Sequence, residues 1–256
     1  MRPLYLLPAL PMLLFGCATP ANHYDPLEPI NRPIYAFNRA VDSAVVKPIA
    51  QGYVAVTPTV VRTGASNFFG NLEDVYIGAS NLLQGKVSDA GKDLGRVLIN
   101  STVGLLGVFD VASQAELPKH KADFGTVLGH WGVGSGPYIV APFIGSKTLR
   151  DSADWVGGYW MDPLRAVPNR PVKNSLSGLK FVNLRASLLS ATAVVDEASF
   201  GDEYSFVRDS YLQRRYSLVW DGNPPEPLKF GDDDDAAAPT SSDAPANAAP
   251  EAPAKP

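Results

Sequence analysis

Apolar residues recur at helical spacing along most of this chain. Six stretches place an apolar residue at every third or fourth position, which is the period of an α-helix with one buried face. The first residues of these six faces are Ile34, Leu72, Leu94, Leu149, Val172 and Tyr204. No stretch shows the alternation between turn signals that is typical of a half-buried strand. The pattern predicts a single all-α domain over residues 25–230.

Residues with capping side chains precede three of these faces. Asn31 stands two positions before Pro33, and proline suits the first turn of a helix, so Asn31 is predicted to be an N-cap. Ser88 and Ser146 have an N-cap side chain and precede the third and fourth faces. These three residues are the predicted starts of their helices.

Two segments do not fit a routine soluble helical bundle. Residues 97–109 carry no charge, so a helix there lacks a solvated side. Residues 124–146 contain no Asp, Glu, Lys or Arg in 23 positions, yet they hold six glycines and two prolines. The glycines and Pro137 would break a membrane-spanning helix, and irregular backbone in hydrocarbon must be covered by protein or line a wet cavity. The segment is therefore either a buried hairpin or loop of a soluble core, or a surface that meets lipid, and the pattern favours the second interpretation.

The N-terminal residues have the pattern of a lipoprotein signal. Arg2 precedes a short apolar run that ends at Gly16 and at Cys17, which is the only cysteine. The run is too short to span a bilayer, and Leu14-Phe15-Gly16-Cys17 resembles a lipobox, although Phe15 departs from the usual small residue. We therefore predict a signal peptide at 1–16, lipidation of Cys17 and a tether over 17–24. By analogy with enterobacterial sorting, Ala18 after the cysteine favours the outer membrane. The alternative is an incidental cysteine behind an ordinary signal peptide.

The C-terminal residues 231–256 are rich in Asp, Ala and Pro and contain no aromatic residue. A segment of this composition cannot bury enough apolar surface to offset its ordering entropy, so we expect a disordered tail. The run Asp232–Asp235 is interpreted as solvated charge and not as a metal site. The tail carries a net charge of −5, from five Asp, one Glu and one Lys, against −4 for the whole chain. The remaining body is close to neutral, which argues against nucleic acid as a partner.

Motifs for covalent chemistry are not found in the sequence. None of the three histidines has a metal-ligand partner at helical spacing, and no phosphate-binding or dinucleotide-binding glycine motif occurs. No serine stands in a G-x-S-x-G elbow, although a hydrolase that uses Ser135 with His130 as its base stays open as an alternative. We predict no catalytic residue, no metal and no cofactor.

Five blocks of the sequence resemble the VacJ/MlaA family. They are DPLEPINRPIYAFN (25–38), NFFGNLEDV (67–75), DLGRVLINSTVGLLGVFDVA (93–112), DFGTVLGHWGVGSGPYIVAPFIGSKTLRD (123–151) and YLQRR (211–215). The blocks follow one another over nearly the whole predicted domain. The acidic tail is outside the shared pattern.

The resemblance implies a particular transport function. It implies an outer-membrane lipoprotein, held on the periplasmic side as a helical ring in the inner leaflet around an amphipathic channel. Mislocalised phospholipids would leave the outer leaflet through that channel and pass to a periplasmic lipid carrier, with a trimeric porin as a further partner. Six residues of the uncharged segment are assigned to the lipid path or the membrane interface, namely Phe124, Trp131, Val133, Tyr138, Ile139 and Phe143. A structural lipoprotein that only scaffolds porins, and a membrane-bound lipid hydrolase, are the alternative functions.

Overall fold

The computed structural model describes residues 18–199 and 201–230, and this part of the chain is helical apart from one short hairpin. The α-helices are α1 (Glu28–Val41), α2 (Lys47–Val56), α3 (Thr59–Leu83), α4 (Val87–Thr102), α5 (Val111–Gln114), α6 (Phe124–His130), α7 (Ala153–Met161), α8 (Arg170–Ser187), α9 (Leu189–Ala198) and α10 (Glu203–Val219). The strands β1 (Tyr138–Ala141) and β2 (Gly145–Thr148) pair antiparallel. The all-α prediction is confirmed for the fold class, but it missed this hairpin. The predicted signal peptide, Cys17 and the acidic tail lie outside the described residues.

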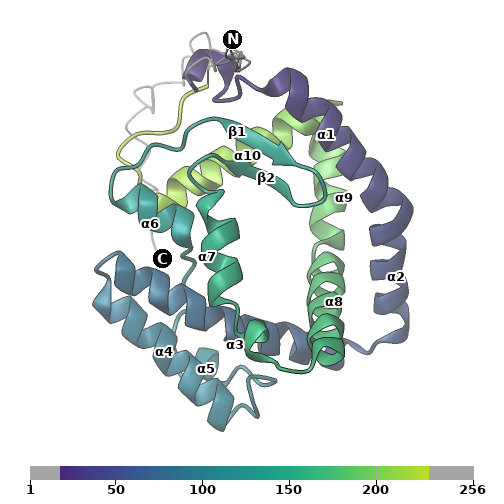
Figure 1. Ribbon diagram of the computed structural model, residues 1–256, viewed down its shortest axis with the longest axis vertical. Helices are drawn as coiled ribbons and strands as arrows, with labels where there is room; N and C mark the ends of the chain where they lie inside the picture. Colours follow the sequence, from purple (N-terminus) through teal and green to yellow (C-terminus); the bar gives the residue numbers. More distant parts are fainter. Residues whose placement is uncertain (1–17, 200, 231–256) are drawn as a thin grey trace, which may run out of the picture.

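The helices are arranged in a ring (Figure 1). Helix α1, the π-helical turn Asp42–Val46 and α2 form one long arm, and α3 then crosses to the opposite side. Helix α4 folds back along α3, with which it makes the most extensive helix–helix contact of the fold. The chain returns through α7 to α8 and α9, which pack beside α2, and α10 then starts next to α1 and crosses along the hairpin to α6.

Charged contacts between distant parts of the sequence close the ring. Arg32 of α1 donates from both Nη atoms to the two carboxylate oxygens of Asp202, which precedes α10, each at 2.9 Å. On the same wall, the Nε and Nη2 atoms of Arg185 in α8 reach Asp42 at 2.7 Å. These bidentate pairs fix the angle between helices as well as their distance.

Polar side chains occupy much of the buried space within the ring wall. In α4 the buried face contains Asp93, Arg96 and Asn100, whereas Leu98 on the predicted buried face is 66% exposed. Leu94, also predicted to be buried, is exposed as well. The helical period was therefore correct, but the apolar face of α4 points out of the protein and the polar face points in. A helix of a water-soluble domain has the opposite arrangement.

A small apolar core lies where the hairpin meets α10. Tyr138 and Val140 of β1 pack with Tyr204 and Leu212 of α10 and with Phe230 near the end of the described chain. Ring centroids of Tyr138 and Tyr204 are 6.3 Å apart, with an edge-to-face arrangement that favours aromatic pairs. This cluster holds the hairpin against the ring.

The predicted helix starts were wrong at all three capping residues. Asn31 lies inside α1, which begins at Glu28, because the Asn31 side chain bonds to β1 and to Asp25 instead. Ser88 is the second residue of α4, and Ser146 belongs to β2. The fourth helix starts only at Ala153, because the chain first makes the hairpin.

The uncharged residues 97–109 do not continue as one helix. Helix α4 ends at Thr102, and the chain then turns through Leu105, Leu106 and Gly107, whose φ angles are 51°, 57° and 89°. Left-handed backbone is unfavourable for leucine, and here it leaves both leucine side chains exposed. Across residues 18–199 and 201–230, every helix is too short or too polar to cross a bilayer.

Candidate functional site

The uncharged segment 124–146 begins with a well-capped helix. Asp123 accepts a hydrogen bond from the backbone N–H of Thr126 at 2.8 Å, and the Thr126 hydroxyl accepts one from the Asp123 N–H at 2.9 Å. This reciprocal pair satisfies the free donors at the start of α6. The segment then runs through a glycine-rich turn, β1, the hairpin tip and the first residues of β2.

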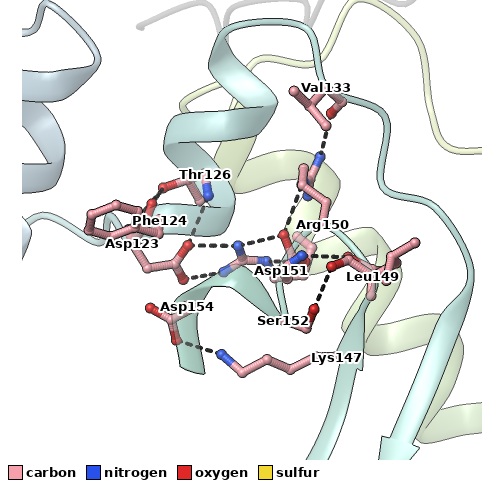
Figure 2. Close-up of polar contacts among 12 residues, drawn as sticks. Asp123, Phe124, Thr126, Val133, Lys147, Leu149, Arg150, Asp151, Ser152 and Asp154 are labelled. Carbon is pink, nitrogen blue, oxygen red and sulfur yellow. Dashed lines mark hydrogen bonds and ion pairs between the residues drawn. The ribbon is translucent and has the colours of Figure 1, made fainter. Parts of the chain in front are cut away.

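Ion pairs hold both ends of this segment to α10. Arg215 of α10 donates to Asp123 at 2.5 and 2.8 Å and to Asp151 at 2.9 and 3.0 Å. Asp123 precedes the segment and Asp151 follows it, and Figure 2 shows the two carboxylates close together. Arg150 contributes a further bond to Asp151 at 2.8 Å. One arginine thus fixes the start and the end of the uncharged segment.

The arginine also determines the charge of both carboxylates. Burial by itself would raise the pKa of Asp123 and of Asp151. The charge of Arg215 and its hydrogen bonds outweigh that effect, and the pKa of each carboxyl lies below its ordinary value. Gly125 allows this close approach, since a Cβ atom there would lie 2.4 Å from Oδ1 of Asp151.

Two asparagines of α1 cover the outer edge of β1. Asn31 donates from Nδ2 to the Tyr138 carbonyl at 3.0 Å and accepts from the Val140 N–H at 2.9 Å. Asn38, two helical turns further on, donates to the Ala141 carbonyl at 3.0 Å. It accepts from the N–H of Phe143 at 2.8 Å. The two side-chain amides therefore pair the free edge of β1 in place of a third strand, which is one way that proteins protect such edges.

The tip of the hairpin presents apolar side chains to the outside. Phe143 is 72% exposed, and its neighbour Ile144 is exposed too. Phe143 has a φ of 61°, an unfavourable angle for an aromatic residue, and its N–H is held by Asn38. Its ring meets that of Phe37 edge to face, with 5.2 Å between centroids. The α1 helix thus fixes an exposed phenylalanine in a defined position.

The six residues assigned to the lipid path do not share one environment. Trp131 and Val133 are 68% and 47% exposed, Phe143 is exposed at the tip, and Ile139 is half-buried. Phe124 stacks on Tyr76 with 5.9 Å between centroids, which makes it a packing residue of α6. Tyr138 is completely buried in the core, so its assignment to the membrane interface was wrong. The segment is therefore partly core and partly exposed apolar surface.

Exposed apolar side chains extend well beyond this segment. They include Val103, Leu105, Leu106 and Phe109 after α4, Val156, Tyr159 and Trp160 on α7, and Leu82 and Leu83 at the end of α3. Single exposed apolar residues are ordinary, but gatherings of this kind mark surfaces that contact lipid or another protein. Helical periodicity could not reveal them, because it shows that a face is apolar and not what covers that face.

The geometry offers little for a hydrolytic reaction. No hydrogen bond joins Ser135 to His130, although both lie in the described ranges. The Ser135 carbonyl instead accepts from the N–H of Arg150 at 3.0 Å. Over residues 18–199 and 201–230, no three His, Cys, Asp or Glu side chains are grouped so that they could hold a metal ion.

Comparison with known proteins identifies the family. The sequence profile described as MlaA lipoprotein matches residues 23–218, which is most of the chain. The chain belongs to the MlaA lipoprotein family. This finding confirms the resemblance carried by the five sequence blocks.

Individual members of the MlaA family agree with this assignment. The Escherichia coli K12 relative is the "Intermembrane phospholipid transport system lipoprotein MlaA", 36% identical over 211 residues that cover 79% of this chain and 82% of the relative. A Haemophilus influenzae protein of the same description is 29% identical over 231 residues, covering 82% and 87%. A solved structure described as the structural basis for maintenance of bacterial outer membrane lipid asymmetry superposes with a TM-score of 0.65 at 30% identity. It is matched over 98% of its length and 76% of this chain.

Proposed function

We propose that this protein is an outer-membrane lipoprotein that removes mislocalised phospholipids from the outer leaflet and passes them to a periplasmic carrier. The observation that carries the proposal is the inverted distribution of side chains in the ring. Charged residues such as Asp93 and Arg96 are buried, while leucines, valines and aromatic residues are exposed. That distribution suits a protein seated in lipid.

The chemistry of the cargo fits a ring of this composition. A phospholipid has two apolar chains and a charged head group, so its path must offer both apolar and polar contacts. Among the residues of the uncharged segment, Trp131, Val133, Ile139 and Phe143 supply the apolar contacts. Transfer breaks no covalent bond, so the protein acts as a transporter and not as an enzyme.

Attachment to the membrane is assigned to the acylated Cys17. Three acyl chains hold a protein far more firmly than the single chain that gives only marginal binding. The exposed apolar side chains of the ring would then rest in the inner leaflet, with the polar parts facing the periplasm. A trimeric porin is proposed as the partner within the membrane.

A lysine at Val133 tests the proposed lipid path. Val133 is about half exposed, so a lysine there can be accommodated without burying its charge in the core. In contact with hydrocarbon, the same charge costs about 2.5–3.5 kcal/mol. The Val133→Lys protein should therefore reach the outer membrane at the normal level, while phospholipid accumulates in the outer leaflet. The uncharged Val133→Ser protein is the matched control, and it should keep lipid asymmetry.

Other outcomes of this experiment would contradict the proposal. Normal lipid asymmetry in Val133→Lys cells with normal protein levels would place the lipid path elsewhere. Purified protein that carries no phospholipid would favour the porin-scaffolding alternative. Cleavage of phospholipid incubated with the purified protein, abolished by Ser135→Ala, would favour the hydrolase.

A further inference from the structure

Two cavities adjoin at the junction of α3 and α8. The larger, of about 610 Å³, is apolar and is lined mainly by Val60, Val61, Phe68, Phe109, Leu176 and Leu179. The smaller, of about 370 Å³, is lined mostly by polar and charged side chains. Asn67 and Phe69 line both cavities. Both volumes lie within the range of small-molecule sites, and the shared lining places an apolar cavity and a polar cavity side by side.

Most charges of the polar cavity neutralise one another. Arg96 donates from Nε to Asp74 at 3.1 Å and from Nη2 to Asp110 at 3.1 Å. The Lys119 ammonium lies 2.8 Å from the second oxygen of Asp74 and 2.9 Å from the Gly70 carbonyl oxygen. Two cations and two carboxylates thus form a closed cluster whose net charge is zero.

Two side chains of opposite charge are left over in the same cavity. Lys180 of α8 has only a partly exposed contact with Asp162, at 3.5 Å, and Asp162 does not line the cavity. Glu73 of α3 is exposed and forms no ion pair within residues 18–199 and 201–230. The cavity therefore offers one weakly paired cation, Lys180, and one carboxylate, Glu73, without an ion pair in the described residues. A ligand that carries both charges would satisfy both groups, whereas an anionic ligand would leave Glu73 as a repulsive neighbour.

We propose that this double cavity is a binding site for a zwitterionic phospholipid of the phosphoethanolamine class. The lipid phosphate pairs with Lys180, its ammonium group pairs with Glu73, and an acyl chain occupies the apolar cavity. The inference rests on the proposed transport function and adds to it a head-group preference. The Arg96 cluster positions the cavity wall and does not contact the lipid.

The test measures which lipid the purified full-length protein retains. The protein is equilibrated with detergent micelles that contain equal amounts of phosphatidylethanolamine and phosphatidylglycerol, and bound lipid is quantified by mass spectrometry. On the natural protein, the ratio of bound phosphatidylethanolamine to bound phosphatidylglycerol should exceed the ratio in the micelles by about two- to fivefold. This is the range expected of a partly exposed ion pair. Glu73→Gln should abolish the enrichment. Lys180→Gln should lower the amount of both lipids.

A third variant separates the apolar part from the polar part. Leu179→Gln should reduce the total bound lipid and leave the ratio of the two lipids unchanged, because it alters only the apolar cavity. Lys229→Gln and Glu226→Gln are the matched controls, since both residues are exposed and lie outside the two cavities. All these positions are at least partly exposed, and circular dichroism verifies that each variant is folded.

The outcomes distinguish this site from the transport function itself. The head-group site is overturned if the natural protein binds the two lipids in equal proportions. It is also overturned if Glu73→Gln leaves the enrichment intact. In both cases the transport proposal stands. Protein that retains neither lipid overturns both.

Discussion

The hydrogen bond from Asn31 to Asp25 leads to a prediction about how the stability of an Asn31 variant depends on pH. Asn31 is buried, and its Nδ2 atom donates to Asp25 at 2.7 Å and to the Tyr138 carbonyl at 3.0 Å. The change Asn31→Asp keeps the shape and the acceptor for the Val140 N–H. It removes both donors and places a second carboxylate against Asp25. The side-chain hydroxyl of Tyr204 also donates to Asp25, so the site cannot open without breaking further bonds.

The expected loss follows from the two missing hydrogen bonds. A bond to a neutral acceptor contributes about 1 kcal/mol and one to a charged acceptor about 1.5–3 kcal/mol. Their sum predicts a destabilisation of roughly 2.5–4 kcal/mol at neutral pH. For a domain of this size each kcal/mol lowers the melting temperature by about 2–4 °C, so we expect a decrease of about 5–16 °C.

The loss should shrink in acid. Burial already raises the pKa of Asp25 in the natural protein, and a second carboxylate would raise the folded-state pKa of the pair further. A group whose pKa is raised on folding stabilises the protein most below its unfolded value, which is about 3.9 for Asp. That stabilisation is lost as the pH rises through the raised pKa of the folded pair. A shared proton restores one donor, so part of the deficit should return as the pH falls below the raised pKa of the pair toward the unfolded value of about 3.9.

The assay is thermal unfolding followed by far-ultraviolet circular dichroism in detergent, at neutral pH and at an acid pH close to the unfolded pKa of about 3.9. Each variant is compared with the natural protein at the same pH. Asn38→Asp is the matched control, because Asn38 pairs the same strand edge but bonds to no carboxylate. It should lose about 1 kcal/mol with little dependence on pH. A deficit for Asn31→Asp that is equal at the two pH values would refute the proposed carboxylate pair.

Three further predictions concern other parts of the chain. Arg215→Met should destabilise the protein by about 3–5 kcal/mol in thermal unfolding, because Asp123 and Asp151 lose their main counter-charge. The additional change Asp151→Asn should recover part of this loss, and no recovery would contradict the explanation. Cys17→Ala should move the protein from the outer-membrane fraction to the soluble periplasm, and retention through salt washes would show that acylation is not what holds it. Deletion of 231–256 should change unfolding stability by less than about 0.5 kcal/mol, so a cooperative drop of several degrees would show that the tail packs on the ring.

The sequence predicted where most helices lie, but not which of their faces is buried. Spacing of apolar residues is a local property, and it located α4 correctly. Whether Leu98 points to protein, water or lipid depends on neighbours that are far away in sequence. In this ring the buried face of α4 is polar, because its side chains bond to polar partners on other elements. Asp93 bonds to Asn81 and His120. Arg96 bonds to Asp74 and Asp110. Such networks are invisible to a hydropathy pattern.

The hairpin escaped prediction for a related reason. Residues 138–141 read Tyr-Ile-Val-Ala, so they show no polar–apolar alternation, and each strand has only four residues. Asn31 and Asn38 provide the edge contacts that such a short hairpin lacks, and the pattern predicted Asn31 to be an N-cap instead. The uncharged segment itself was recognised from composition, and its side chains Trp131, Val133 and Phe143 are exposed in the structure. Composition could not reveal that Tyr138, in the same run, belongs to the core.

The closure of the ring determines when the protein can complete its fold. Arg32 and Asp202 are separated by 170 positions, and the bond from Arg39 to Glu203 spans 164. Contacts of such long sequence separation form slowly, since the intervening loop must first be brought together. Helix α1 can therefore complete its contacts only after α10 has formed, and until then Tyr138 and Val140 of the hairpin are not covered by Tyr204 and Leu212. On the proposed route to the outer membrane, this interval would be spent in water, where aggregation competes with assembly.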